Sequence, residues 1–506
     1  MKILTKELIH QADSYTIVNE PIASIDLMER ASKAFVDELL EIVPLARIFC
    51  VVCGSGNNGG DGFAIARILA KQHYSVKVFH IQSHKPLSRD CTCNLERLQN
   101  IVSPTLDISI VSLTDISELE IPAQAIIIDA IFGSGLHTSI QGLSKECIIK
   151  LNALPNIRVA VDIPSGLYCD RPQQVGDTIF KAHYTITFQY PKLSFLFLEN
   201  EQFVGDWSVV PIGLSKEFEE MVSTPYFFTM HCDVTLQSYS RFAHKGNKGH
   251  ALIVAGSTGK TGAAVLAARA CISSGCGLVT AHVPQNSNTI MQIAIPEVMT
   301  SIDEGLDIIQ SIPNFNSISA IALGPGIGTH SKTQQALIQY ISHASIPMVL
   351  DADALNIVSL HKEILSKLPQ DTILTPHPGE FDRLTRKHES SFERLQTQIA
   401  FSKQTKCIVV LKGKYTSITL PNGDVWFNST GNHGMATAGS GDTLTGIIVS
   451  LLAQGYTPNQ ASIYGVFIHG LAGDLALQTY STESLLASSI ITYLGDAFKQ
   501  LNREML

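Results

Sequence analysis

Three segments in the first half of the chain place glycine and acidic residues where an apolar run ends. The stretch GSGNNGGDG, residues 54–62, follows RIFCVVC and has the G-x-G-x-x-G spacing, whose bare backbone N–H groups suit a pyrophosphate. Asp129 and Asp162 stand at the ends of the apolar runs IIIDA and VAVDI. Because the carboxyl ends of parallel strands share one edge of a sheet, we expect the three segments to converge on one ligand site.

The glycine loop lacks the second anchor of an NAD-dependent dehydrogenase. In that class an acidic residue about 20 positions further on holds the ribose hydroxyls, but here the next apolar run ends in FHI, residues 79–81. The loop itself carries Asn57, Asn58 and Asp61. A turn that uses Asn, Gly and Asp for their tolerance of left-handed backbone is the structural alternative. The pattern favours a nucleotide-binding loop that serves a different chemistry.

Oxygen-bearing side chains in these segments suggest a bound cation. Asn58, Asp129 and Ser165 offer amide, carboxylate and hydroxyl oxygens, which are the ligands of hard cations. Thiolates and imidazoles, which zinc prefers, are absent from the three segments. We therefore predict a monovalent or alkaline-earth ion.

In the second half, the segment AGSGDTLTG, residues 438–446, runs directly into an apolar helix pattern. The N-terminal amides of such a helix form an anion site, and Asp442 beside it could accept a hydroxyl proton during phosphoryl transfer. The alternative is that Asp442 only caps the helix. A P-loop is excluded upstream, because Val254 occupies the position of the first Walker glycine in VAGSTGKT.

The elements that position these residues follow from a regular alternation. Short β-branched runs alternate with amphipathic stretches of helical length in both halves, which predicts α/β units with parallel sheets and crossover helices. The rhythm breaks at residues 213–229, where we place a domain boundary. Asn422-Gly423 predicts a type I′ hairpin turn. The predicted strands are RIFCVVC, YSVKVFHI, AIIIDA, RVAVDI and YTITFQY, then ALIVAG, LVTAHV, AIALG, PMVLDA, TILTPH and CIVVLKG.

Composition narrows the function classes. A chain of 506 residues that is 45% hydrophobic can form more than one core. The net charge of -9 leaves no broad basic face, so we expect no nucleic-acid partner. Ten scattered cysteines indicate a reducing compartment. Charged residues near the N-terminus and the lack of a bilayer-length apolar run predict a cytoplasmic protein without membrane contact.

The motifs GSGNNGGDGFAIAR, DAIFGSGL, DIPSGL and AHYTITFQYPK occur in an order that resembles the NAD(P)H-hydrate epimerase domain, over residues 1–215. The resemblance implies a Rossmann-like three-layer domain that interconverts the R and S hydrates of the nicotinamide ring. It implies a catalytic role for Asp162 and potassium held by Asn58, Asp129 and Ser165. The implied hydrate-binding residues are Asn57, Asn58, Gly59, Gly60, Asp61, Gly133, Ser134, Gly135, Leu136, His137, Thr138, Ser139 and Asp162.

Residues 225–506 resemble the ADP-dependent NAD(P)H-hydrate dehydratase domain of the ribokinase-like fold, from HKGNKGHALIVAG to IYGVFIHGLAGDLA. The resemblance implies that Asp442 takes the proton of the ring hydroxyl, with a magnesium ion as counter-charge and ADP as co-substrate. The implied hydrate-binding residues are Ala263, Gly326, His377 and Asp442. The implied nucleotide-binding residues are Lys412, Gly413, Lys414, Tyr415, Thr416 and Gly441.

Together the two resemblances imply a bifunctional repair enzyme for damaged nicotinamide cofactors. Its expected small-molecule partners are NADHX, NADPHX and ADP, its expected ions are K⁺ and Mg²⁺, and we expect a homo-oligomer. The alternative is a ribokinase-like small-molecule kinase, which would release a phosphorylated product, fused to a non-catalytic Rossmann-like binding module.

Overall fold

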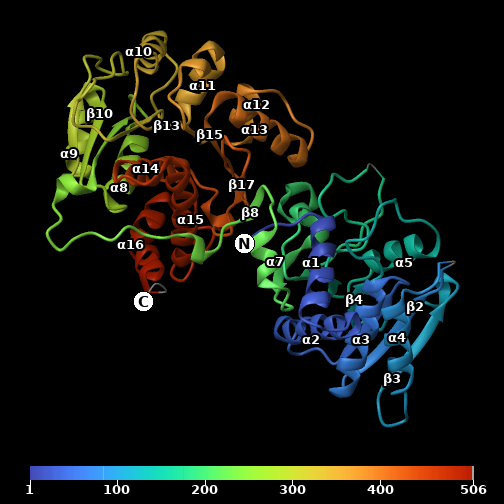
Figure 1. The fold of residues 1–506 in the computed structure, drawn as a ribbon. Helices are drawn as coiled ribbons and strands as arrows, with labels where there is room; N and C mark the ends of the chain where they lie inside the picture. The colour runs from blue at the N-terminus through green and yellow to red at the C-terminus, as the bar shows by residue number, and fades with distance from the viewer. Residues whose placement is uncertain (84, 175, 504–506) are drawn as a thin grey trace. The chain divides into compact units, whose positions relative to one another are not determined.

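The computed structural model describes residues 1–83, 85–174 and 176–503. The chain divides into two compact units, Lys2–Thr224 and Pro225–Leu506, and Met1 belongs to the second (Figure 1). The division falls inside residues 213–229, where the sequence rhythm breaks. Within the described ranges, no helix has the length and hydropathy that a bilayer-spanning segment needs.

The N-terminal unit is built on a parallel sheet of seven strands in the order β3-β2-β1-β4-β5-β6-β7. Buried clusters cover both faces of the sheet, so the predicted Rossmann-like three-layer arrangement is confirmed. The strands are β1 (Ile48–Cys53), β2 (Ser75–Ile81), β3 (Ile108–Leu113), β4 (Ile126–Ala130), β5 (Arg158–Val161), β6 (Tyr184–Phe188) and β7 (Asp206–Val210). The helices are α1 (Lys6–Asn19), α2 (Ser24–Ile42), α3 (Asn57–Lys71), α4 (Arg89–Gln99), α5 (Gly142–Ala153), α6 (Glu201–Val204) and α7 (Lys216–Met221).

The strand order reverses direction between β1 and β4. From β1 the chain builds outward through β2 to β3, and it then returns to the other side of β1 with β4. In open parallel sheets, ligands bind outside the carboxyl ends of the strands at such a reversal. The glycine loop follows β1 and Asp129 lies near the end of β4, so both stand at this point.

Glycine is required in the loop after β1 because backbone segments touch there. A Cβ on Gly59 would lie 2.0 Å from the Gly54 carbonyl oxygen, and a Cβ on Gly54 would lie 2.0 Å from the Ile131 carbonyl oxygen. These close approaches seat the N-terminus of α3 against β1 and the segment after β4. The first and last glycines of the motif therefore serve packing, whereas a Cβ on Gly56 would meet nothing within 4 Å.

The C-terminal unit contains a ten-stranded sheet in the order β11-β10-β9-β12-β13-β14-β15-β16-β17-β8. The run from β11 to β15 is parallel, and β16 is antiparallel to both of its neighbours. The strands are β8 (Tyr226–Phe228), β9 (His250–Val254), β10 (Leu278–Val283), β11 (Met299–Ile302), β12 (Ala320–Leu323), β13 (Met348–Leu350), β14 (Ile373–Leu374), β15 (Ile408–Leu411), β16 (Ser417–Thr419) and β17 (Val425–Phe427).

Helices on both faces of this sheet complete the predicted ribokinase-like α/β unit. Two buried clusters fill the space between the helices and the two faces. The helices are α8 (Thr261–Ser273), α9 (Gln285–Ala294), α10 (Ser331–Ile341), α11 (Asp353–Leu360), α12 (Pro378–Leu384), α13 (Ser391–Thr405), α14 (Ser440–Ala453), α15 (Pro458–Ala476) and α16 (Ala487–Arg503).

The hairpin between β16 and β17 exists, but the predicted type I′ turn is wrong. Such a turn needs positive φ at both central residues, and only Gly423 has it, with φ of 102°. The Gly423 N–H instead donates to the Leu420 carbonyl across a turn that has Pro421 in its second position. Proline fixes φ near −65°, which favours this wider turn followed by a left-handed glycine.

We expect Gly59→Ala to destabilise the N-terminal unit by about 3 kcal/mol, because the new methyl group would overlap the Gly54 carbonyl oxygen. Gly56→Ala is the matched control and should stay within about 0.5 kcal/mol of wild type. Urea unfolding of the two variants measures the difference. Equal stability of the two would show that the loop relaxes without cost.

Candidate active sites

A cavity of about 740 Å³ lies at the carboxyl ends of the strands of the N-terminal unit. The structure brings most of the predicted residues to its wall, namely Asn57, Asn58, Asp61, Gly133, Ser134, Gly135, Leu136, His137, Thr138 and Asp162. Gly59 and Gly60 instead pack against Gly54 and Met28. Ser139 is exposed and donates to Asp177 at 2.6 Å. These three predicted residues therefore do not line the cavity.

Two of the three predicted cation ligands, Asp129 and Ser165, are hydrogen-bonded to each other. Asp129 is fully buried and accepts hydrogen bonds from the Ser165 hydroxyl at 2.6 Å and the Ser165 N–H at 2.8 Å. Burial raises the pKa of Asp129 to about 6 despite these donors. Gly133, on the loop after β4, lies against the Asn58 side chain.

The chemistry of the side chains tests whether these residues fit a cation. Asn58, Asp129 and Ser165 offer amide, carboxylate and hydroxyl oxygens, which are the ligands of a hard cation. Asp129 is also a fully buried carboxyl, whose negative charge a cation would compensate. The Asn58 Nδ2 is buried without a hydrogen-bond partner among the described residues, but as a donor it calls for an acceptor and not for a cation. The residues therefore fit the predicted ion through their oxygens.

Asp162 is held at the cavity by a buried lysine. One oxygen, Oδ1, accepts from Lys192 Nζ at 2.7 Å, from the Thr187 hydroxyl at 3.0 Å and from the Phe188 N–H at 3.0 Å. Lys192 has a side chain only 1% exposed and also donates to the Tyr190 carbonyl. No described residue donates to the other oxygen, Oδ2, of Asp162. The sequence analysis missed Lys192, although a lysine inside the apolar run YPKLSFLF is itself a signal of a buried partner.

Two further carboxylic acids line the same cavity. Burial and the charge of Asp162 raise the pKa of Asp13 to about 6, and Lys192 partly offsets them. Burial also raises the pKa of Asp61 well above its usual value, with the charges of Asp162 and Asp13 adding to the effect. Asp13 lies on α1, in a stretch that carries no motif, and sequence reasoning missed it.

In the C-terminal unit, Asp442 stands in the first turn of α14, whose N-cap is Gly439. Lys412, at the end of β15, pairs with Asp351 Oδ1 at 2.9 Å, and the Thr445 hydroxyl of α14 donates to Asp351 Oδ2 at 2.8 Å. A Cβ on Gly441 would lie 3.3 Å from Lys412 Nζ. Three predicted residues thus meet at a buried ion pair, whose carboxylate, Asp351, sequence reasoning did not include.

The pKa of Asp442 is set first by its burial and then by the neighbouring ion pair. Burial and the negative charge of Asp351 raise the pKa of Asp442 to about 6, and Lys412 counteracts them. Burial disfavours the Lys412 ammonium, but Asp351 and Glu380 outweigh it and raise the pKa of the lysine. Near pH 7, Asp442 is therefore mostly ionised but still close to its protonated form, as a general base requires.

The remaining predicted residues of this unit lie at three positions in the fold, of which His377 at the start of α12 is described below. Ala263 and Gly326 are neighbours, since a Cβ on Gly326 would lie 3.1 Å from the Ala263 Cβ. Residues 413–416 form a turn in which the Thr416 hydroxyl bonds to the backbone of Gly413. Lys414 donates to the Gly431 carbonyl, and the Tyr415 ring lies 6.3 Å from that of Phe228.

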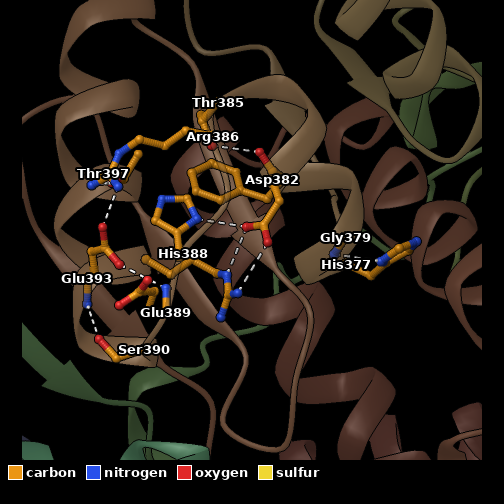
Figure 2. Close-up of polar contacts among 12 residues, drawn as sticks. His377, Gly379, Asp382, Thr385, Arg386, His388, Glu389, Ser390, Glu393 and Thr397 are labelled. Atoms are coloured by element: carbon orange, nitrogen blue, oxygen red, sulfur yellow. Dashed lines mark hydrogen bonds and ion pairs between the residues drawn. The ribbon is translucent and has the colours of Figure 1, made fainter.

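His377 is the N-cap of α12 and is half-exposed, while Glu380 in the first turn is buried and accepts from the His377 N–H. Figure 2 shows His377 apart from a polar cluster further along α12, in which Asp382 accepts from His388 and Arg394. That cluster anchors the segment between α12 and α13. The hydrogen bond to Glu380 fixes the backbone of His377 at the N-terminus of α12, and its side chain is half-exposed.

The two folds define a two-domain α/β protein, with a cavity at the strand ends of the N-terminal unit and a polar group of Asp351, Lys412 and Asp442 at the N-terminus of α14 in the other. A family model for the YjeF-related protein N-terminus matches residues 24–194, and a model for NAD(P)H-hydrate dehydratase matches residues 251–495. These matches agree with the order of the two units.

Relatives cover the whole chain. The bifunctional NAD(P)H-hydrate repair enzyme of Moorella thermoacetica is 33% identical, over 100% of this chain and 98% of the relative. The enzyme of the same name from Thermofilum pendens is 31% identical, over 100% and 96%. A crystal structure of the ADP/ATP-dependent NAD(P)H-hydrate dehydratase from Bacillus subtilis is 32% identical and covers 54% of this chain and 98% of its own, with a TM-score of 0.48. The chain therefore belongs to the bifunctional NAD(P)H-hydrate repair enzymes.

We expect Asp442→Asn to stabilise the C-terminal unit at pH 8 by up to about 3 kcal/mol in the absence of nucleotide. The raised pKa of Asp442, about 6 in place of 3.8, favours folding at low pH, and this contribution is lost as the pH rises through 6. The gain in the variant should therefore shrink towards pH 4. Urea unfolding at both pH values measures it, with the exposed Asp496→Asn as control. A destabilised variant at pH 8 would contradict the burial argument.

Proposed function

We propose that this chain repairs hydrated NAD(P)H with the residues gathered in its two sites. The N-terminal unit epimerises the R and S hydrates, and the C-terminal unit dehydrates the S epimer while ADP is converted to AMP and phosphate. The observation that supports the assignment most strongly is Asp442, a carboxyl with a pKa of about 6 in the first turn of α14, beside the Lys412–Asp351 pair.

In the dehydratase site, Asp442 accepts the proton of the ring hydroxyl as that oxygen bonds to the terminal phosphorus of ADP. The bond from this phosphorus to the bridging oxygen breaks, and AMP leaves with the electron pair. The backbone amides of residues 439–441 and the Lys412 ammonium stabilise the negative charge on the transferring group. The ring nitrogen lone pair then expels phosphate, and loss of a ring proton restores the dihydronicotinamide. Magnesium, when bound, supplies further positive charge to the phosphates.

The other assignments in this unit are part of the same proposal. Lys412, the turn of residues 413–416 and Gly441 bind the adenine nucleotide, because they surround the N-terminus of α14 or follow β15. Ala263, Gly326 and His377 contact the hydrate. ADP, NADHX and NADPHX are the proposed ligands, and we propose a cytoplasmic homo-oligomer.

In the epimerase site, the Asp162 carboxylate faces the cavity with the oxygen that its three donors leave open. We assign it the proton transfer that accompanies inversion of the ring carbon bearing the hydroxyl. Residues 57–61 and 133–139 contact the hydrate, and Asn58, Asp129 and Ser165 hold potassium. The ion, when bound, would compensate the buried charge of Asp129 and fix the loop after β4.

The decisive assay supplies the full chain with mixed R and S hydrates, ADP, potassium and magnesium, and follows the return of dihydronicotinamide absorbance. We expect complete conversion by the wild type, none by Asp442→Asn, and rapid consumption of only the S fraction by Asp162→Asn. Asp162→Asn that consumed both epimers at the wild-type rate would contradict the epimerase assignment. A stable phosphorylated product, detected by ³¹P NMR, would favour a kinase instead.

Potassium should stabilise the N-terminal unit and support epimerisation but not the dehydration of S hydrate. At a concentration near 100 times its Kd, a ligand adds about 2.7 kcal/mol to stability. Thermal unfolding in potassium and in tetramethylammonium salts measures the shift. Ser165→Ala should remove most of it, whereas Thr105→Ala, on an exposed loop, should keep it. An unchanged shift in Ser165→Ala would place the ion elsewhere.

A further inference from the structure

The cavity of the N-terminal unit is more acidic than hydrate binding alone requires. Asp13 of α1, Asp61 of α3 and Asp162 after β5 all line it. Lys192 is the buried cation opposite them, and its ammonium is already engaged by Asp162, Thr187 and the Tyr190 carbonyl. With the ammonium engaged in this way, the carboxyl groups are the side chains of this group that can supply negative charge to a cationic intermediate.

Asp13 and Asp162 differ in how they are held. Asp162 is fixed through Oδ1 by three donors, one of them charged. Asp13 is partly buried, yet no hydrogen bond to its side chain occurs within the described ranges of the chain. Burial and the charge of Asp162 raise its pKa to about 6. An unpaired acid that titrates near neutral pH can both give and take a proton. One carboxyl alone cannot act on both faces of the ring, so interconversion of the two epimers needs a second group.

The dehydratase site of the same chain shows the same arrangement. There Lys412 and Asp351 form the ion pair, and the neighbouring Asp442 is the group whose pKa is raised to about 6. In the epimerase site, Lys192–Asp162 is the pair and Asp13 is the neighbouring acid. Burial is the first cause in both cases, the paired aspartate adds to it, and the lysine opposes it.

Asp61 is the less suitable proton carrier of the two remaining acids. It follows the glycine loop in the first turns of α3, where bound phosphates are expected, and its pKa is raised well above the usual value. Asp13 also lies outside residues 24–194, the part of the unit that the family model matches.

Resting on the proposed epimerase function, we propose that Asp13 is a second catalytic residue, the acid–base partner of Asp162 in the epimerisation. The Asp13 carboxyl gives its proton to the hydroxyl oxygen of the hydrate, the C–O bond breaks, and water leaves with the electron pair. The ring nitrogen lone pair forms a C=N⁺ bond. Water then adds to the other face of that carbon and loses a proton to the Asp162 carboxylate. The opposite epimer reacts with the two roles exchanged, and solvent returns the protons.

The test uses the full chain with potassium but no nucleotide, so that the dehydratase is idle, and follows conversion of pure R hydrate to S by chromatography. We expect Asp13→Asn to lower kcat between about 10² and 10⁴-fold with little change in KM. Asp13→Glu should recover part of the rate. The exposed Asp26→Asn on α2 is the matched control and should match the wild type. In H₂¹⁸O, each turnover of the wild type should place one labelled oxygen on the ring carbon.

The pH profile separates catalysis from structure. The wild-type kcat should fall on an alkaline limb as Asp13 loses its proton, and Asp13→Asn should lack that limb. The groups that face Asp13 are Asp61, Asp162, Lys192 and Tyr190, and His10 and Lys85 line the same cavity. If Asp61→Asn removes the limb instead, the inference is wrong. Asp13→Asn should fold at least as well as the wild type at pH 8, because it removes a carboxyl with a raised pKa.

Three further outcomes would overturn the inference while leaving the proposed function intact. The first is that Asp13→Asn keeps the wild-type kcat. The second is that Asp13→Asn changes only KM, which rises. The third is that the wild type epimerises the hydrate without taking up ¹⁸O. A wild type that does not interconvert the hydrates would instead overturn the proposed function of this unit. Loss of activity in both Asp13→Asn and Asp162→Asn, with S hydrate still dehydrated normally when ADP is added, supports the pair.

Discussion

An ion pair between lysine and aspartate, with at least one partner fully buried, organises each of the two sites. Lys192 lies 2.7 Å from Asp162, and Lys412 lies 2.9 Å from Asp351. Removing a charge from water is costly unless a partner and further hydrogen bonds compensate it, and hydroxyl groups complete both pairs, from Thr187 and Thr445. The carboxyl ends of parallel strands make this possible, because they bring distant segments of the chain to one edge. Without the pair, neither site would have a carboxylate of fixed position.

Each ion pair also affects the pKa of a neighbouring aspartate, Asp13 in one site and Asp442 in the other. Asp13 and Asp442 are each buried next to a paired aspartate whose negative charge adds to the effect of burial, and the lysine offsets only part of it. In each site, one aspartate is therefore held by a lysine, and a neighbouring aspartate without such a partner has the raised pKa. What distinguishes the two reactions is the surroundings. Asp442 lies at the N-terminus of α14, which favours phosphate, whereas Asp13 lies among other acids, which favour a cation.

The interior of both sheets could be predicted from the sequence, and their edges could not. Every strand predicted from an apolar run lies inside a sheet, whereas β3, β7, β8 and β11, which were not predicted, are the four edge strands. An edge strand has one solvated side, so segments such as MTSI lack a continuous apolar run. The sites divide similarly. Residues in glycine-rich loops could be predicted from spacing, but Asp13, Lys192 and Asp351 could not, because only tertiary contacts with distant segments bury them.

A carboxyl with a pKa near 6 has a cost as well as a use. An aspartate at its ordinary pKa of about 3.9 is almost fully ionised at pH 7 and rarely available as an acid. Raising the value makes the proton available, but it also means that the folded state at pH 7 carries a charge that the surroundings disfavour. Each unit surrounds its site with an extensive buried core, which is the source of stability that can offset such a penalty. The partial burial of these acids is therefore a requirement of acid–base chemistry at neutral pH and gives the fold no stability of its own.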